Sequence, residues 1–310
     1  ARERLQPYED RLLSHIASGH EIEPARVTPR LVEVQPDSED ELLFRYVSLH
    51  WSIPTSSGYG RRLRFLVEDA HNGKLIGIIG LCDPVFSVAA RDAWIGWNAQ
   101  ARKSRLRHVM EAFILGAVPP YSMLLCGKLV AMLCASDEVR MAFRRKYGKG
   151  RSIISGAARD GRLVMITTSS AFGRSSVYNR LRYRDRLLMV PVGYTSGWGD
   201  FQFSNGIYAE LRDYANAYCE KTAKHESWGI GFRNRREVVR KVLRDVGLSP
   251  NLLQHRLKRE VFVVPLARNA REFLRGEHQR LNRTKLGLKL TIQTDLVLQL
   301  PVVLIEPSWD

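Results

Sequence analysis

The sequence predicts an α+β protein with a mixed central sheet flanked by helices and a basic, helical C-terminal extension. Three features carry this prediction. Two apolar runs at 62–68 and 74–81 flank Asn72-Gly73, a dipeptide typical of a tight β-hairpin. Apolar residues recur at helical spacing over 123–147. Basic side chains accumulate in the later part of the chain.

The composition is that of a globular protein. A chain of 310 residues with 45% hydrophobic and 26% charged side chains is neither fibrous nor disordered. No uncharged apolar run reaches the roughly 18 to 20 residues that a membrane-spanning helix needs, because the best candidate, 124–135, contains Lys128. The first four residues, ARER, are charged where a signal peptide is apolar. We therefore expect a cytoplasmic protein without a membrane partner.

The four cysteines predict neither a metal site nor disulfides. Cys82, Cys126, Cys134 and Cys219 form no C-x-x-C pair. Cys126 and Cys134 fall on one predicted helix, where eight residues span about 12 Å, too far to share a zinc ion. We expect reduced thiols in the core, no metal and no cofactor.

The distribution of charge is the strongest functional signal. Residues 1–90 hold 10 basic and 13 acidic side chains, whereas residues 91–310 hold 38 basic and 19 acidic ones. Such asymmetry indicates a polyanionic partner, and nucleic acid is the most common one, with DNA favoured here. An anionic membrane or an acidic protein is the rarer alternative, and charge that serves solubility alone is the simplest one.

The elements are predicted in chain order. Residues 1–30, with Pro24 and Pro29, suggest an N-terminal arm of short helices, and Ser38 with Glu41 forms a capping box before a helix. Further strands are predicted at 30–34, 108–118, 163–168, 187–192 and 261–264, and further helices at 175–181, 207–218 and 233–246, with strand or loop after 285. The domains expected are an arm (1–30), an α/β core (31–200) and a basic helical extension (201–310) whose strand near 257–265 returns to the core.

This order of elements resembles the GNAT (acyl-CoA N-acyltransferase) fold over 31–194 and the strand near Phe262. In that fold the strand before the long helix splays from its neighbour, and a glycine-rich turn after it offers backbone N–H groups to the cofactor pyrophosphate. The corresponding stretch here, 117–124, has no glycine, and Pro119 and Pro120 supply no N–H at all. We therefore expect a degenerate GNAT-like domain without acetyl-CoA chemistry.

A second resemblance rests on residues rather than on element order. The stretches that carry it are LIGIIG (75–80), RDAWIGW (91–97), TTSSAFGRSSVYNRL (167–181), VGYTSGWG (192–199), REVFVVPLA (259–267) and EFLRG (272–276). Together they resemble the DruA family, which occurs in the Druantia anti-phage system of bacteria. The resemblance spans about 60–280 and implies a cytoplasmic defence component that works with other Druantia proteins, including a large helicase. It implies no catalytic residue.

A first candidate binding segment lies at 173–186. Its fourteen residues contain five arginines, two tyrosines and a Gly-Arg-Ser-Ser turn at a predicted helix start, and a helix N-terminus attracts phosphate. The candidate contact residues are Arg174, Ser175, Ser176, Tyr178, Arg180 and Arg182. The alternative is that a serine only caps the helix, Tyr178 packs inward and the arginines are solvated.

A second candidate surface lies on the predicted helix 233–246. At 100° per residue, four arginines fall within one sector beside an apolar face: Arg233, Arg236, Arg240 and Arg244. Lys258 and Arg259 extend this surface. A merely solvated face usually carries compensating acids, but residues 233–289 hold 16 basic and 5 acidic side chains. We predict that this stripe contacts phosphates.

Other motifs favour structural roles. The glycine-rich stretch 193–200 lacks a P-loop or Rossmann pattern and is interpreted as a turn, and Trp94 and Trp97 are interpreted as packed. No H-x-x-x-H or G-x-S-x-G motif occurs. Five acids in these stretches are expected to be ion-pair partners rather than metal ligands: Asp83, Asp92, Glu111, Asp185 and Asp200.

The sequence thus favours a nucleic-acid-binding subunit of a Druantia-type defence system. An active enzyme in the same system, either an acyltransferase or one that processes nucleic acid, is the main alternative. A third possibility is an assembly scaffold whose basic surface meets acidic partner proteins.

Overall fold

A computed structural model of the chain defines the fold. The structure describes residues 2–51, 60–151, 156, 160–183, 186–197, 199–201, 203, 206–220 and 232–282. The predicted strand or loop after 285 lies outside these residues. The chain divides into two compact units: Ala1–Gly193 with Glu260–Asp310 forms the first, and Tyr194–Arg259 forms the second. The chain therefore leaves the first unit after residue 193 and returns to it at residue 260.

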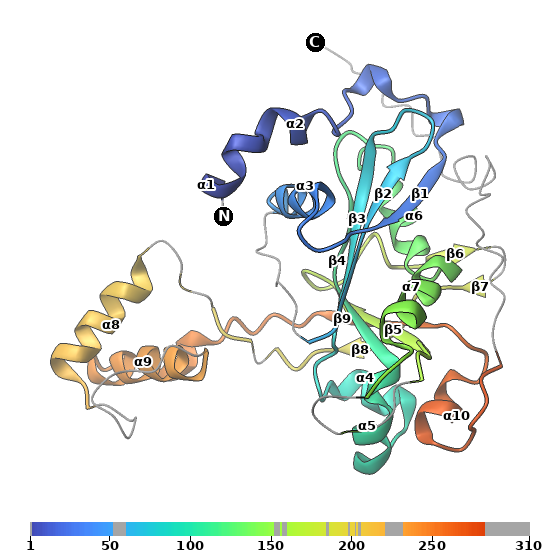
Figure 1. The fold of residues 1–310 in the computed structure, drawn as a ribbon. Helices are drawn as coiled ribbons and strands as arrows, with labels where there is room; N and C mark the ends of the chain where they lie inside the picture. Colours follow the sequence, from blue (N-terminus) through green and yellow to red (C-terminus); the bar gives the residue numbers. More distant parts are fainter. Residues whose placement is uncertain are drawn as a thin grey trace, which may run out of the picture. The chain divides into compact units, whose positions relative to one another are not determined.

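The first unit is built on a seven-stranded sheet in the order β1-β2-β3-β4-β5-β9-β8 (Figure 1). The strands are β1 (Pro29–Glu33), β2 (Arg62–Asp69), β3 (Leu75–Cys82), β4 (Val109–Ala117), β5 (Met165–Ser169), β8 (Val190–Tyr194) and β9 (Glu260–Pro265). β2 and β3 form the predicted antiparallel hairpin, and Gly73 in its turn has φ +73°, a conformation that favours glycine. β4 and β5 pair in parallel while β3–β4 and β5–β9 are antiparallel, so the predicted mixed sheet is confirmed.

Helices cover both faces of this sheet. Along β2, Phe65 and Val67 pack with α6 (Cys126–Leu133) and α7 (Asp137–Tyr147), while Leu66 between them packs with α3 (Glu39–Ser48) on the other face. This alternation is the period-two pattern of a strand buried on both sides. The predicted N-terminal arm contains the short helices α1 (Arg2–Leu5) and α2 (Glu9–Leu13).

The prediction of a single helix over 123–147 is wrong. Residues 121–125 form turns, and the helical stretch breaks at Ser136, whose extended backbone (ψ 164°) starts α7. Leu129 of α6 and Phe143 of α7 nevertheless belong to one buried core cluster. Because both helices present their apolar side to the same core, the helical spacing continues across the break.

Three short helices were not predicted. These are α4 (Ala89–Ile95), α5 (Ala99–Arg105) and α10 (Ala270–Arg275); α4 and α10 share a core that includes Ile95 and Phe273. Each has only six or seven residues, so its apolar positions do not repeat often enough to give a helical period. A two-stranded hairpin, β6 (Arg182–Tyr183) and β7 (Arg186–Leu187), is also new.

The second unit contains the predicted helices α8 (Ile207–Tyr218) and α9 (Phe232–Asp245), followed by the 3-10 turn η5 (Pro250–Leu253). Val238 and Val242 of α9 are buried against Ala215 of α8, with Tyr214 beside them. Gly247, with φ +74°, follows the end of α9, as a left-handed C-terminal residue does.

Candidate nucleic-acid interface

The arginines of α9 stand beside its apolar face. Arg236, Arg240 and Arg244 follow one another at intervals of four residues, which places them on one side of the helix. They flank the valines that are packed against α8. Arg233 begins the same stripe, but its side chain lies outside the described residues.

Arg236 is held by an internal ion pair. Its Nε lies 2.5 Å from Asp200 Oδ2, and its terminal nitrogen donates to Asp200 Oδ1 at 3.3 Å. The Asp200 side chain is only 7% exposed. Removing one partner of such a shielded pair leaves the other charge without compensation. Arg236 therefore fixes α9 to the segment around Asp200, as the sequence predicts for that acid.

Arg240 and Arg244 have no such carboxylate partner among the described residues. Arg244 is exposed, and Arg240 is half-buried. Nε of Arg240 is shielded from solvent without a hydrogen-bond partner in the described part of the chain. A shielded N–H without a partner is uncommon in folded proteins. Among the described side chains of the stripe, these two guanidinium groups differ from Arg236 in having no carboxylate partner.

Lys258 and Arg259 lie in a ribbon in which residues 194–197 and 199–201 face residues 253–259. Thr195 N donates to Arg259 O at 2.8 Å, and Arg259 N donates to Thr195 Oγ1 at 3.0 Å. Lys258 is exposed. Nε of Arg259, like that of Arg240, is shielded and unpartnered within the described residues.

The glycines of 193–200 allow this ribbon to close. A Cβ on Gly199 would lie 2.0 Å from His255 Nε2, and one on Gly197, at φ +76°, would lie 3.0 Å from Arg256 O. The described residues of this stretch therefore form one side of the ribbon with a bend at Gly197, and the glycines serve the close approach of two chain segments.

The helix predicted at 175–181 is wrong, because these residues form a turn. Ser175 Oγ accepts the Tyr178 N–H at 3.2 Å and Ser175 O accepts the Asn179 N–H, so the serine caps a single turn. Arg180 has φ +57°, a left-handed conformation that stops a helix. The segment thus has no helix N-terminus to offer a phosphate.

Within this turn, four of the six candidate residues are exposed: Arg174, Ser176, Arg180 and Arg182. Tyr178 is different, because its hydroxyl donates to Leu115 O at 3.3 Å and its ring packs edge-on against Phe262. Burial raises the pKa of Tyr178 to about 12. The two predicted surfaces belong to different units: this turn to the first, and α9 with Lys258 and Arg259 to the second.

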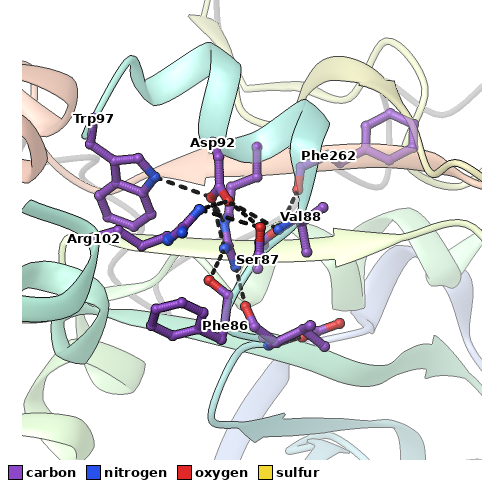
Figure 2. A network of polar contacts seen from close by, with 11 residues as sticks. Phe86, Ser87, Val88, Asp92, Trp97, Arg102 and Phe262 are labelled. Carbon is purple, nitrogen blue, oxygen red and sulfur yellow. Dashed lines mark hydrogen bonds and ion pairs between the residues drawn. The ribbon is translucent and has the colours of Figure 1, made fainter. Parts of the chain in front are cut away.

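The segment RDAWIGW forms a polar network around Asp92 (Figure 2). The Asp92 carboxylate accepts five hydrogen bonds of 2.9 to 3.3 Å, from Ser87 Oγ, Val88 N, Arg91 Nε, Trp97 Nε1 and an Arg102 terminal nitrogen. Arg91 is fully buried and also donates to the carbonyls of Val85 and Phe86. The network therefore holds the loop before α4 and packs Trp97, as predicted, instead of leaving it free to stack on a base.

Comparison with known proteins decides the family. The sequence profile of the family described as "Druantia protein DruA" matches residues 1–276. The chain belongs to the DruA family. A curated relative named "Druantia protein DruA" from Escherichia coli (strain UMEA 4076-1) is 44% identical over 264 residues, which cover 85% of this chain and 65% of the relative. The chain thus spans about 65% of the length of that relative. No solved structure matches the chain.

In this member of the DruA family, the sequence did not indicate that Arg91 is fully buried. Glu111, predicted to be an ion-pair partner, lies in the apolar strand β4 and accepts the Val85 N–H at 3.1 Å, and burial raises the pKa of its carboxyl. The signal for Glu111 was present, because an acid in the middle of an apolar strand indicates a buried partner.

The described part of this DruA-family chain was searched for metal-binding groups and for membrane-spanning helices. It contains no group of three or more His, Cys, Asp or Glu side chains placed to hold a metal ion. None of its described helices combines the length and apolar character needed to cross a bilayer. The thiols of Cys126 and Cys134 are buried, and burial raises the pKa of each to about 12.

Proposed function

We propose that this DruA-family chain is a nucleic-acid-binding protein, with DNA the favoured ligand, and that it acts without acetyl-CoA chemistry on a GNAT-like sheet. The observation that carries the proposal is the pair Arg240 and Arg244 on α9. They stand on one side of an amphipathic helix, in the strongly basic part of the chain, without a carboxylate partner among the described residues. Guanidinium groups so placed are suited to phosphate oxygens.

We expect these arginines to contact the phosphates of the nucleic acid rather than its bases. Lys258 and Arg259 belong to the same unit as α9, and the exposed Arg174, Arg180 and Arg182 of the first unit are secondary candidates. Such contacts fix position on a nucleic acid but carry no sequence information. We therefore expect binding that depends strongly on salt and weakly on base sequence.

Two features support the absence of acetyl-CoA chemistry. The turn between β4 and α6 contains Pro119 and Pro120, which have no N–H. The five N–H groups at 122–126 all donate to carbonyls of residues 118–122. These five donors are therefore not available to a pyrophosphate.

The opening between β4 and β5 is the second feature. Their parallel pairing covers only Val109–Glu111 with Met165–Thr167, so the strands separate beyond it, as in the GNAT fold. The Thr168 and Tyr178 side chains bridge that separation by donating to carbonyls of β4. The space that would admit a pantetheine arm is thus bridged by side chains of this chain.

Membership in the family supports a place in a Druantia-type anti-phage defence system. On this basis we assign the chain to the cytoplasm, working with other Druantia proteins, including a large helicase. The nucleic-acid surface on α9 then supplies contact with the DNA on which such an assembly acts.

The test compares variants that each remove charge from the second unit. Binding to a short DNA duplex and to a single strand is measured by anisotropy over a range of salt concentrations. R240Q/R244Q is expected to weaken binding to every sequence and to flatten the slope of log K against log salt by about 1.8 on duplex or about 1.4 on single strands. The control R212Q removes a positive charge from an exposed position of α8 in the same unit and should change neither the affinity nor the salt slope.

Two outcomes overturn the proposal. One is an unchanged affinity and salt slope in folded R240Q/R244Q. The other is a variant that still binds nucleic acid but no longer binds an acidic partner protein, which supports an assembly scaffold instead.

Calorimetry with acetyl-CoA, run beside an active acetyltransferase, should show no heat of binding. Saturable binding would favour an acyltransferase.

A further inference from the structure

A hollow lies in the first unit beside α3. The arm helices α1 and α2 lie on the same face of the sheet as α3, where Leu5, Leu12 and Leu43, one from each helix, share a buried core cluster (Figure 1). Next to this cluster the packing leaves a cavity of about 650 Å³ that is partly open to solvent. Its described walls come from the arm, from α3 and the residues that follow it, and from the turn after β4. The volume is within the range of pockets that hold small molecules.

The described walls of this cavity are mainly apolar. Leu5, Val47 and Val118 belong to the buried core cluster, and Ile16 packs against it. Leu49, which follows α3, is exposed. Apolar walls in contact with water favour a ligand with an apolar body, because binding removes both apolar surfaces from water.

The described walls also carry one acid, Glu9, and no lysine or arginine. Glu9 starts α2 and its side chain is exposed, so it stands where the cavity meets solvent. The Tyr46 hydroxyl donates to Glu9 Oε1 at 3.1 Å, which ties α3 to α2 beside the cavity. Burial, together with Glu9, raises the pKa of Tyr46, so the phenol stays protonated and remains a donor. The carboxylate is therefore held in place at the cavity.

No cation neutralises this carboxylate among the described residues. Arg11, two residues along the chain, pairs with Glu39 instead, with its Nε 2.7 Å from Glu39 Oε1. The His50 imidazole, which also lines the cavity, packs edge-on against Trp51 and forms no ion pair with Glu9 in the described part of the chain. An added cation would therefore be attracted to Glu9, whereas a phosphate or carboxylate group would be repelled.

We propose that this cavity binds a small molecule that combines an apolar body with an ammonium group. The body contacts the apolar walls, and the ammonium group donates a charge-assisted hydrogen bond to the Glu9 carboxylate. The same carboxylate disfavours nucleotides and nucleic-acid strands in this cavity. Because the cavity lies in the first unit and attracts cations, the proposal stands independently of the phosphate-binding surface proposed on α9.

The test uses three probes that share one indole body and differ in charge. Tryptamine is a cation, tryptophol is neutral and indole-3-propionate is an anion. Calorimetry of the full chain at constant ionic strength gives the three affinities. We expect tryptamine to bind about fivefold more tightly than tryptophol, which is the contribution of an exposed ion pair, and indole-3-propionate to bind most weakly.

Two neutralising changes on one helix assign this preference to the cavity. Glu9→Gln removes the charge at the cavity, while Asp10→Asn removes a charge from the next residue, which is exposed in the same first turn of α2 and is not among the described wall residues. E9Q should bind tryptamine and tryptophol equally, with its affinity for tryptophol unchanged. D10N should keep the fivefold preference. Thermal unfolding without ligand checks that both variants retain the fold.

Charge reversal provides a second measurement. E9K should bind indole-3-propionate more tightly than tryptamine, because a cation now stands where the carboxylate was. D10K should keep the wild-type order of the three probes.

Three outcomes overturn the proposal. If the wild type binds none of the probes saturably, the cavity is not a site for a small molecule and is left to a protein segment. Equal affinities of the wild type for tryptamine and tryptophol mean that Glu9 selects no cation. Equal losses of preference in E9Q and D10N assign the effect to general surface charge. R240Q/R244Q should bind tryptamine like the wild type, and E9Q should keep the wild-type salt slope on DNA, so this proposal and the nucleic-acid proposal can fail separately.

Discussion

The Tyr178 hydroxyl donates a hydrogen bond to Leu115 O, at 3.3 Å, across the opening where β4 separates from β5. One turn holds the tyrosine there, because Ser175 Oγ accepts the Tyr178 N–H. The ring packs edge-on against Phe262 of β9 with centroids 5.6 Å apart. A residue of the arginine-rich segment 173–186 therefore packs into the core of the sheet, while Arg174, Ser176, Arg180 and Arg182 of the same segment are exposed.

Tyr178 is therefore expected to contribute to stability and not to nucleic-acid affinity. Y178F keeps the ring and loses one hydrogen bond, which should lower the free energy of unfolding by about 1 kcal/mol. Y178A also loses the packing against Phe262 and should cost about 3 to 5 kcal/mol. Urea unfolding measures both changes. A Y178F protein with full stability but weakened DNA binding would instead place the phenol in the interface.

Six of the seven strands of the main sheet fall close to predicted strands, but the strand predicted at 187–192 is divided between β7 (Arg186–Leu187), which pairs with β6, and β8 (Val190–Tyr194). Helices were harder to predict where the apolar spacing continues across a break, as at Ser136, or where the helix is as short as α4. The turn at 175–181 was misjudged for a third reason. Nothing in the sequence shows that Arg180 adopts a positive φ, which ends the turn before it becomes a helix.

The candidate sites show the same limit. Helical spacing placed Arg236, Arg240 and Arg244 on one side of α9, but not the pairing of Arg236 with Asp200, 36 residues earlier. For the same reason, nothing in the sequence shows that Arg105 and Arg162 meet over the ring of Phe273. The spacing of residues along the sequence shows which side of a helix they occupy. Contacts with residues distant in the sequence decide which of their charges are paired.

Asp92 should be among the most sensitive positions of the first unit. Asn at this position has one accepting oxygen and turns an NH2 group toward donors, and it removes the charge that compensates the fully buried Arg91. We expect D92N to lower the free energy of unfolding by about 3 to 5 kcal/mol. Denaturant unfolding with Trp fluorescence measures this loss.

The matched control is D10N, because Asp10 is exposed in the first turn of α2. D10N should lower the free energy of unfolding by no more than about 1 kcal/mol, the usual contribution of an acid near a helix N-terminus. Equal, small losses in D92N and D10N would mean that the network in Figure 2 contributes little to stability.

Acid should destabilise the first unit through His108. Burial lowers the pKa of this imidazole from 6.5 to about 4, so the folded protein disfavours its protonation. Below pH 6.5 the unfolded chain takes up a proton that the folded chain does not accept until about pH 4. Stability is therefore complete above pH 6.5 and falls by at most about 3 kcal/mol as the pH drops to 4.

Unfolding midpoints in urea between pH 7.5 and 4 measure this loss. H108Q should be less stable at neutral pH, because it loses the edge contact with Phe273, but its stability should vary less over this range. H20Q, at an exposed position, should keep the wild-type dependence. The lowered pKa of Asp160 acts in the same direction only at lower pH, below 3.8. An H108Q protein with the wild-type dependence would assign the acid sensitivity to other groups.

The ribbon of the second unit depends on the absence of a side chain at Gly199. A Cβ there would lie 2.0 Å from His255 Nε2, well inside contact distance, so G199A must displace the imidazole or part the two segments. His255 packs edge-on against Phe201 and accepts the Leu257 N–H at Nδ1, which limits how far its ring can move. We therefore expect G199A to destabilise the second unit by about 1 to 3 kcal/mol. Hydrogen exchange of amides such as Phe201 N, which donates to Leu253 O, should report it.

The double variant G199A/H255A makes this explanation specific. Removing the imidazole makes room for the new methyl group, so the double variant should recover part of the protection that G199A loses, giving a favourable coupling energy in the double-mutant cycle. G19A is the control, because a Cβ on Gly19 would meet no atom within 4 Å and its backbone has no positive φ. If G199A and H255A add without coupling, the glycine is needed for its backbone conformation and not for the approach of His255.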